Sequence, residues 1–263
     1  MRIQILTIIK KILLKNRAFG TRATEKRKLL DFLESIKPVK TNYDLIRLGG
    51  DSDGGYLIPN DIENLEACFS PGVANIADFE IDLAKKGIKC FMADYSIEKL
   101  PINNSLFDFE KKYLGSTNNK EYITLENWIE SKTSNKSDLI LQMDIESSEY
   151  SVIFDTPSEI LKRFRILVIE FHKLHYMFNP MGFELISLTF EKILKNFEIV
   201  HIHPNNVDKL VEYDGISVPP TMEFTFLRKD RITSKTRNLS FPHKLDQANT
   251  YKKDDFVLPK CWY

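Results

Sequence analysis

The chain has 263 residues, of which 43% are hydrophobic and 28% are charged. This composition is typical of a folded globular protein and excludes a mostly disordered chain. No apolar run reaches the ~18–20 residues that a transmembrane helix needs. The length favours one large α/β domain with appendages over two full domains.

Charge is distributed unevenly along the chain, although Lys+Arg and Asp+Glu are equal at 37 each. Residues 1–28 contain nine basic residues and one acid, a net charge of +8, so the remainder carries −8. A nucleic-acid-binding protein usually carries its basic patch on the folded body, so we expect no nucleic-acid partner. Cys68, Cys90 and Cys261 form no CxxC motif or Cys/His cluster, which favours reduced thiols in a cytoplasmic protein.

Residues 1–16 have the pattern of an amphipathic helix. Apolar residues follow the 3.6-residue period at Ile5, Ile8, Ile9 and Ile12, and lysines lie largely on the other side. The lysines interrupt the apolar stretch and no small-residue cleavage site follows, which disfavours a signal peptide. We predict that residues 1–20 bind an anionic membrane surface, on the inner face of the membrane. A helix docked on the body or on a partner fits the pattern equally well.

Further along the chain, apolar segments of strand length alternate with segments of helical period. Strands are predicted at 65–70, 88–93, 139–143, 164–169, 197–202 and 222–227, and helices at 25–36, 76–86 and 184–196. This alternation predicts an α/β fold with a doubly wound, mostly parallel sheet. We expect an N-terminal helical segment over 1–40, the main domain over 41–230, and a tail over 231–263 that packs on the domain.

Polar residues follow the predicted strands at the positions where an open α/β sheet binds its ligands. The strand ends carry Ser70-Pro71-Gly72, Asp94, Asp144 and Glu146, Glu170 and His172, and His201 and His203. Asp94 follows Gly72 by 22 residues, the spacing at which an acid binds ribose hydroxyls in dinucleotide sites. The loop SPGVAN lacks a GxGxxG run, so we expect an adenosyl ligand without a pyrophosphate.

Seven segments resemble the FkbM-type S-adenosylmethionine (SAM)-dependent methyltransferases and the related class I group that contains a DGGY segment. They are DGGYLI (53–58), CFSPGVANIADFEIDLA (68–84), FMADYS (91–96), TLENWI (124–129), LQMDIESSEYSVI (141–153), ILVIEFH (166–172) and HIHPNN (201–206). The family more often has glycine where this chain has Ser147. The resemblance implies a Rossmann-like class I methyltransferase fold, whose seven-stranded, mostly parallel sheet ends in an antiparallel hairpin. It also implies SAM as the methyl donor and a hydroxyl acceptor, expected on a sugar of a surface polysaccharide or glycan precursor.

The resemblance also assigns residues to the cofactor. The expected contacts are Ser70, Pro71 and Gly72 of the first loop, Asp94 and Tyr95 after the second strand, and Asp53 and Tyr56 of the DGGY segment. Of these, Asp94 is expected to bind the ribose.

Activation of the acceptor is expected at the ends of the two central strands. Asp144 would orient the acceptor hydroxyl, and His172 would act as general base, with His203 as its substitute. Acids at the positions of Asp144 and Glu170 hold a divalent metal in catechol-type methyltransferases, so Mg²⁺ on these two acids, with or without His172, is one alternative. In the other alternative, Asp144 and Glu146 bond to backbone amides and shape the pocket.

Two further functions fit parts of the sequence. Asp144-Ile145-Glu146 resembles the acid-x-acid motif that binds the metal of a nucleotide sugar, which would indicate a metal-dependent glycosyltransferase. A non-catalytic, membrane-tethered binding module that kept the fold is the other alternative. The spacing of Asp94 and the DGGY segment favour the methyltransferase.

Overall fold

The computed structural model describes residues 11, 15, 20–134, 137–255 and 257–263. The predicted amphipathic helix over 1–16 therefore lies outside the described residues except at Lys11 and Lys15. In the described part of the chain, no helix has the length and apolar character needed to cross a membrane.

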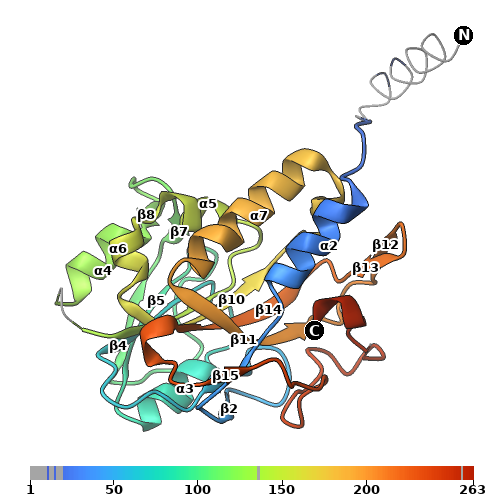
Figure 1. The fold of residues 1–263 in the computed structure, drawn as a ribbon. Coiled ribbons are helices and arrows are strands. Elements are labelled where there is room, and N and C mark those ends of the chain that lie inside the picture. Colours follow the sequence, from blue (N-terminus) through green and yellow to red (C-terminus); the bar gives the residue numbers. More distant parts are fainter. Residues whose placement is uncertain (1–10, 12–14, 16–19, 135–136, 256) are drawn as a thin grey trace, which may run out of the picture.

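A seven-stranded sheet forms the centre of the molecule (Figure 1). Its strands, in spatial order, are β6 (Phe107–Glu110), β5 (Lys89–Ala93), β4 (Ala67–Pro71), β9 (Leu139–Met143), β10 (Phe164–Phe171), β14 (Met222–Arg228) and β11 (Phe197–Pro204). All pairs are parallel except those that β14 makes with β10 and β11. The central strands are buried along their whole length, as expected for a parallel sheet that is covered on both faces.

Helices and a hairpin cover the two faces of the sheet. One face packs against α2 (Lys26–Ser35), α4 (Leu125–Lys132), α5 (Glu149–Asp155), α6 (Ser158–Leu161) and α7 (Pro180–Leu194). The other packs against α3 (Asp78–Lys85) and the antiparallel hairpin of β2 (Leu45–Leu48) and β3 (Tyr56–Pro59). Figure 1 shows α2 and α7 side by side above the sheet and α3 below it.

The remaining elements are short. They are β1 (Lys40–Thr41) paired with β15 (Lys235–Thr236), β7 (Tyr113–Gly115) with β8 (Tyr122–Thr124), β12 (Val211–Tyr213) with β13 (Ile216–Val218), and the 3₁₀ turns η1 (Leu174–Phe178), η2 (Lys229–Arg231) and η3 (Lys260–Trp262). Both appendages contribute to the core: Leu29 and Phe32 of α2 are buried, and so is Trp262 of the tail.

The strand order confirms the predicted fold class. The chain runs outward through β4, β5 and β6 and returns to β9, which pairs with the other edge of β4. The last strand, β14, then enters antiparallel between β10 and β11. This is the Rossmann-like class I methyltransferase fold, and its topological switch point lies between β4 and β9, where such sheets bind ligands.

Two strands are longer than the sequence predicts. The prediction ended them before Glu170 and at Ile202, whereas β10 extends to Phe171 and β11 to Pro204. The reason is β14, whose residue Glu223 pairs with Glu170 on one side and with His203 on the other. Of the residues predicted at the ends of these two strands, Glu170, His201 and His203 therefore lie within the strands, and only His172 follows its strand.

Candidate active site

The ends of β4 and β9 approach each other closely at the switch point. Gly72 has φ +88°, and a Cβ added there would lie 1.6 Å from the carbonyl oxygen of Asp144. The backbone N–H of Asp144 donates to the carbonyl of Pro71 at 3.3 Å. Only glycine fits this contact, which holds the first loop against the end of β9.

Two adjoining pockets open at this point. The larger, of about 570 Å³, is lined by Asp53, Gly72, Ala74, Ala93, Asp94, Ser96, Tyr113, Leu114, Tyr122, Asp144, Ile145, Glu146 and Ser148. The smaller, of about 70 Å³, is lined by Asp53, Gly54, Tyr56, Gly72, Val73, Ala74, Ile76, Phe79, Glu80, Gln142 and Asp144. The two share Asp53, Gly72, Ala74 and Asp144, so four of the residues predicted from the sequence for the cofactor, Asp53, Tyr56, Gly72 and Asp94, line this pair of pockets.

Asp94 is held in a fixed orientation where β5 ends. Its side chain is buried, and its residue is only 6% exposed. Oδ2 accepts the backbone N–H of Ala74 at 2.9 Å, and Oδ1 accepts the N–H and the hydroxyl of Ser96, both at 2.7 Å. The carboxylate thus joins the loops after β4 and β5 and borders the larger pocket.

Three tyrosines lie together beside this pocket. The ring centroids of Tyr113 and Tyr122 are 5.5 Å apart, and Tyr95 lies 5.1 Å from Tyr113. Tyr113 and Tyr122 line the pocket, whereas the predicted residue Tyr95 packs against Tyr113 and lines neither pocket. The sequence prediction missed Tyr113 and Tyr122 because they come from the polar segment that forms the small β7–β8 sheet.

Ser70 and Pro71 line neither pocket. The Ser70 hydroxyl lies 2.6 Å from Oε1 of Gln142 and also contacts Glu80, while the Gln142 amide donates to the Tyr56 hydroxyl at 3.1 Å. Burial raises the pKa of Glu80 to about 7, against the opposing effect of the Ser70 hydroxyl. Ser70 therefore supports the floor of the smaller pocket.

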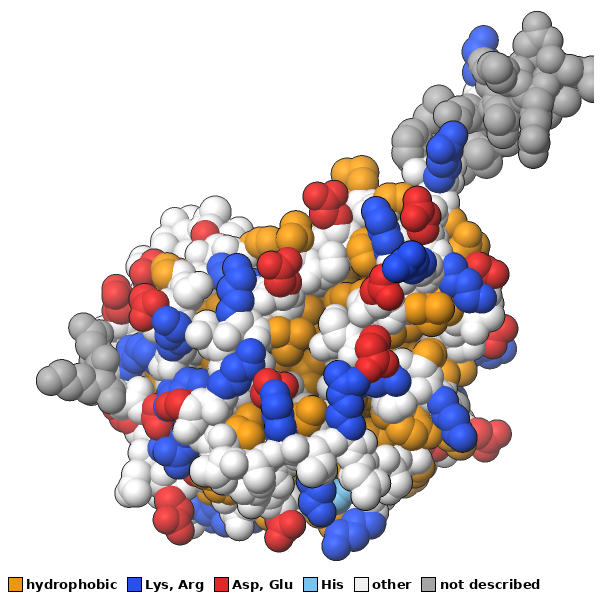
Figure 2. Space-filling model, in the orientation of Figure 1, with side chains coloured by type: hydrophobic (Ala, Val, Ile, Leu, Met, Phe, Trp, Pro, Cys, Tyr) orange, Lys and Arg blue, Asp and Glu red, His pale blue; other side chains and the backbone are white. Residues whose placement is uncertain are grey.

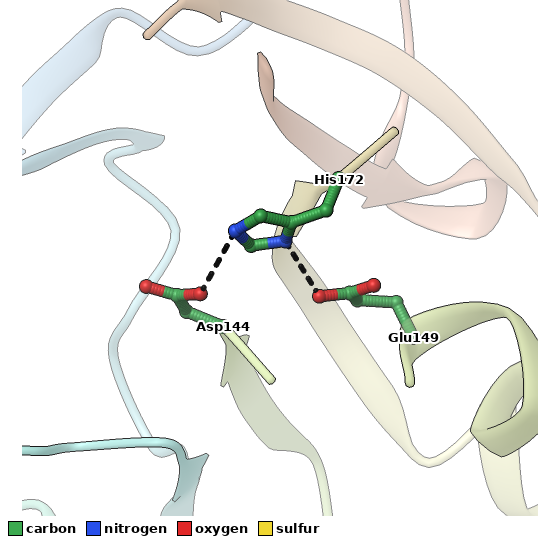
Figure 3. A group of neighbouring side chains, drawn as sticks. All are labelled: Asp144, Glu149 and His172. Atoms are coloured by element: carbon green, nitrogen blue, oxygen red, sulfur yellow. Dashed lines mark hydrogen bonds and ion pairs between the residues drawn. The ribbon is translucent and has the colours of Figure 1, made fainter. Parts of the chain in front are cut away.

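His172 is oriented by a carboxylate that the sequence prediction missed (Figure 3). Its Nδ1 lies 2.9 Å from Oε1 of Glu149, a fully buried residue of α5. The same oxygen accepts the backbone N–H groups of Ile145 and Ser147, each at 3.2 Å, so Nδ1 is the donor. The Tyr150 hydroxyl donates to the His172 carbonyl at 2.7 Å, which fixes the backbone as well.

The other ring nitrogen of His172 faces the end of β9. Nε2 lies 3.7 Å from Asp144 Oδ1, 3.6 Å from Glu146 Oε2 and 4.0 Å from Glu170 Oε1. Desolvation raises the pKa of Asp144 to about 7, although His172 opposes the shift. Burial alone would lower the pKa of His172, but the hydrogen bond to Glu149 and the charges of Asp144 and Glu146 raise it overall. Within the described residues, Asp144, Glu149 and His172 form a group whose ligand atoms all lie within 4.8 Å of one another, and the predicted ligand Glu170 is not part of that group.

His203 belongs to a separate network under the C-terminal tail. Its Nδ1 lies 3.8 Å from Asp246, which also pairs with Nε2 of His201 at 2.9 Å. Neither pocket at the switch point includes His203. For His203 to act as general base in place of His172, as the sequence predicts, the tail would have to move away from β11.

The turn between β9 and α5 contains two residues with positive φ. Glu146 and Ser147 have φ values of +54° and +83°. The second value lies in the region where glycine is favoured. This backbone path brings the amides of Ile145 and Ser147 to Glu149.

Comparison with known proteins adds structural neighbours of low identity. No family model matches the chain, and no curated protein matches it in sequence. An rRNA methylase from Streptococcus thermophilus has 11% identity over 78% of this chain and 99% of that chain, with a TM-score of 0.33. A chain of a fibrillarin/Nop5p complex has 10% identity over 64% of this chain and 74% of that chain, with a TM-score of 0.38. Such similarity supports no inference about activity, so the fold assignment rests on the strand order.

Proposed function

We propose that the chain is a SAM-dependent O-methyltransferase of the FkbM type that methylates a sugar hydroxyl of a surface polysaccharide or glycan precursor. The observation that carries this proposal is the shared lining of one pocket by Gly72, Asp94 and Asp144. These residues end three adjacent parallel strands at the switch point of a class I methyltransferase sheet.

The residues around the two pockets fit the parts of SAM. The buried Asp94 carboxylate would accept the ribose hydroxyls, because a carboxylate has more acceptor sites than its present partners use. The rings of Tyr113 and Tyr122 would contact the adenine, and Asp53 would attract the ammonium group of the amino-acid end. When bound, SAM supplies a methyl group made electrophilic by its sulfonium.

The charge of the site supports a neutral acceptor that donates hydrogen bonds. The described linings of both pockets contain five acids, Asp53, Glu80, Asp94, Asp144 and Glu146, and no lysine or arginine. A phosphate-rich acceptor such as nucleic acid needs basic partners. Sugar hydroxyls, in contrast, donate well to carboxylates, and this favours a glycan over a nucleic acid.

A sugar hydroxyl must lose its proton, or have its pKa lowered, before it attacks a methyl group. Asp144 and His172 are the groups proposed for this step, because Asp144 lines both pockets and His172, which follows the neighbouring strand, has its Nε2 3.7 Å from Asp144 Oδ1. Either His172 accepts the proton as a general base, or a cation held by the same side chains lowers the pKa of the hydroxyl.

Calorimetry with SAM and with a nucleotide sugar tests the proposal. SAM should bind the wild-type chain, and the nucleotide sugar should not. Asp94→Ala and the isosteric Asp94→Asn should weaken SAM by about 1.5–3 kcal/mol, or roughly 10–150-fold, because a hydrogen-bonded charged group is lost.

Asp230→Ala is the matched control, because Asp230 is exposed on η2 at the amino ends of the parallel strands, away from both pockets, where it pairs with Arg228. Melting temperatures should be recorded for each variant, since Asp94 also holds two loops together. Binding of the nucleotide sugar alone would favour the glycosyltransferase. Equal SAM affinity in folded Asp94 variants would remove Asp94 from the site.

A further inference from the structure

Asn249 of the C-terminal tail is buried beside the segment that carries Asp53. Between β15 and η3 the described residues form no helix or strand, and only Asn249 and Leu258 among them are buried. Asn249 is 6% exposed. An asparagine in an irregular segment is ordinarily left in solvent, and a buried polar side chain is ordinarily hydrogen-bonded. The burial of Asn249 therefore indicates a specific contact.

Asn249 joins two elements that are far apart in the sequence. Its carbonyl accepts the backbone N–H of Asp53 at 3.2 Å, and its side-chain Nδ2 donates to Oε1 of Glu223 at 2.7 Å. Asp53 lines both pockets at the switch point, whereas Glu223 is a buried residue of β14. Asn249 itself lines neither pocket, so it can act on a bound ligand only through its neighbours.

The two residues that follow Asn249 hold the tail at this place. The backbone N–H of Thr250 donates to Oδ1 of Asn206, and Nδ2 of Asn206 donates to the Thr250 carbonyl, both at 2.9 Å. The Tyr251 hydroxyl donates to the carbonyl of Asp51. The tail is thus bonded on one side to the loop after β11 and on the other to the turn between β2 and β3.

The Asn249 amide also compensates a buried acid that lies near an exposed one. Burial raises the pKa of Glu223, the charge of Asp53 adds to the rise, and the hydrogen bond from Asn249 opposes it. Glu223 and Asp53 therefore repel each other when both are ionised, and Asn249 is bonded to both residues. Without the amide, the Glu223 carboxylate would lose this donor, and the carbonyl that holds the Asp53 backbone would no longer be fixed.

We propose that Asn249 is a positioning residue that sets Asp53 to bind the amino-acid end of the cofactor. The inference rests on the proposed function, in which Asp53 attracts the ammonium group of SAM. The bond from the Asn249 side chain to Glu223 fixes the Asn249 backbone, and the Asn249 carbonyl in turn fixes the backbone from which the Asp53 side chain projects. The tail is then part of the cofactor site as well as part of the core.

Two ligands that differ only in the amino-acid end test this role. S-adenosylhomocysteine carries the ammonium group, and 5′-methylthioadenosine has the same adenosine and sulfur without it. In calorimetry on the full-length chain, Asn249→Ala should weaken S-adenosylhomocysteine about tenfold, as loss of one hydrogen bond does, and leave the affinity for methylthioadenosine unchanged. Asp53→Asn should give the same difference between the two ligands. A general loss of structure would weaken both ligands equally.

A paired exchange separates positioning from packing. Asn249→Asp combined with Glu223→Gln restores the hydrogen bond with donor and acceptor reversed and keeps the net charge of the pair. This double variant should regain most of the affinity for S-adenosylhomocysteine that Asn249→Ala loses. Asn238→Ala, at an exposed position of the same tail, is the control and should bind both ligands as wild type does. Should Asn249→Ala not fold, Asn249→Ser, whose hydroxyl is too short to reach Glu223, gives the same comparison.

Equal weakening of both ligands in the Asn249 variant would show that the residue only supports the fold, and it would overturn the inference. Unchanged affinity for S-adenosylhomocysteine would do the same, and so would a paired exchange that recovers none of the lost affinity. A wild-type chain that binds neither ligand would refute the proposed function itself, and the inference with it. Binding of both ligands with no difference between wild type and the Asn249 variant refutes the inference alone.

Discussion

Ser147 has a backbone conformation that an L-residue adopts only at a cost. Its φ is +83°, and the preceding Glu146 is also positive at +54°. The turn is nevertheless retained because it delivers two backbone amides to the buried Glu149 carboxylate. Local strain is thus offset by a hydrogen-bond network that orients His172.

Ser147→Gly should stabilise the fold. A left-handed conformation costs an L-residue roughly 1–2 kcal/mol, and the substitution relieves this cost. The greater conformational freedom of glycine in the unfolded chain offsets about 0.5–1 kcal/mol of that gain. We expect the free energy of unfolding to rise by about 1 kcal/mol or less, measured by urea denaturation. Ser148→Gly is the matched control: its φ is −80°, so the same change should lower stability. A Ser147→Gly protein no more stable than wild type would contradict the strain argument.

Among the residues of the candidate site, the sequence pointed to those that directly follow long strands, but not to two buried acids that come from helices. Gly72, Asp94 and Asp144 could be found because the carboxyl end of a parallel strand is a fixed landmark. Glu149 is the first residue of α5, a position at which an acid is ordinarily exposed to solvent. Its burial follows only from tertiary packing. Glu80 of α3 was missed as well, because an acid is ordinarily exposed wherever it lies on a helix.

Among the elements, α3 shows how one buried side chain links a helix to two strands. Its Glu80 lies under the sheet and contacts Ser70 of β4, which in turn contacts Gln142 of β9. The helical period predicted α3, and it places Glu80 on the apolar face, four residues after Ile76 and three before Leu83. Glu80 is therefore buried when the helix packs on the sheet, and Ser70 gives its carboxyl a polar partner.

Glu80 should make stability depend on pH. Burial raises its pKa from 4.5 to about 7, so the native state holds this proton more tightly than the unfolded state. The stabilisation is fully present below about pH 4.5 and is lost as the pH rises to about 7, a change of order 3 kcal/mol. Glu80→Gln should remove this pH-dependent loss of stability, because the glutamine amide has nearly the same shape as the carboxyl group but does not titrate.

Urea denaturation at pH 5 and pH 8 measures this difference. Wild type should lose more stability than Glu80→Gln over that interval. Glu121→Gln makes the same change at an exposed position and should behave as wild type. Parallel pH profiles for wild type and Glu80→Gln would show that Glu80 does not titrate in this range.

At the scale of the whole molecule, the long apolar strands and amphipathic helices were predictable, and the small sheets were not. The β7–β8, β12–β13 and β1–β15 pairs have two or three residues per strand, too few for a periodic pattern. Which residues of α2 and of the predicted tail join the core was not predictable. Burial of Phe32 and Trp262 depends on α7 and the sheet, which are distant in sequence.

Thr24, which lies just before α2, is bonded to the body beside an apolar surface. The N–H and hydroxyl of Thr24 donate to the carbonyls of Phe178 and Met177, at 2.9 and 2.8 Å, which fixes the exit point at the start of α7. Met181 is 81% exposed there, and Leu185 and Leu188 continue the same side of α7. Figure 2 shows hydrophobic side chains gathered over α2 and α7 on this face.

Membrane association should depend on residues 1–20 and on salt. Residues 1–28 carry a net charge of +8, and each basic residue near an anionic surface contributes about 1 kcal/mol, which salt screens. We expect the full chain to float with vesicles that contain phosphatidylserine, and we expect a chain lacking residues 1–20 to stay at the bottom of the density gradient. Neutral vesicles and high salt should each abolish flotation of the full chain.

Met181→Ser, which removes an exposed apolar side chain from α7 while leaving the charge unchanged, should weaken flotation modestly if the body also contacts the membrane. Equal flotation with and without residues 1–20 would exclude the segment as the anchor, and flotation indifferent to salt would exclude the electrostatic mechanism.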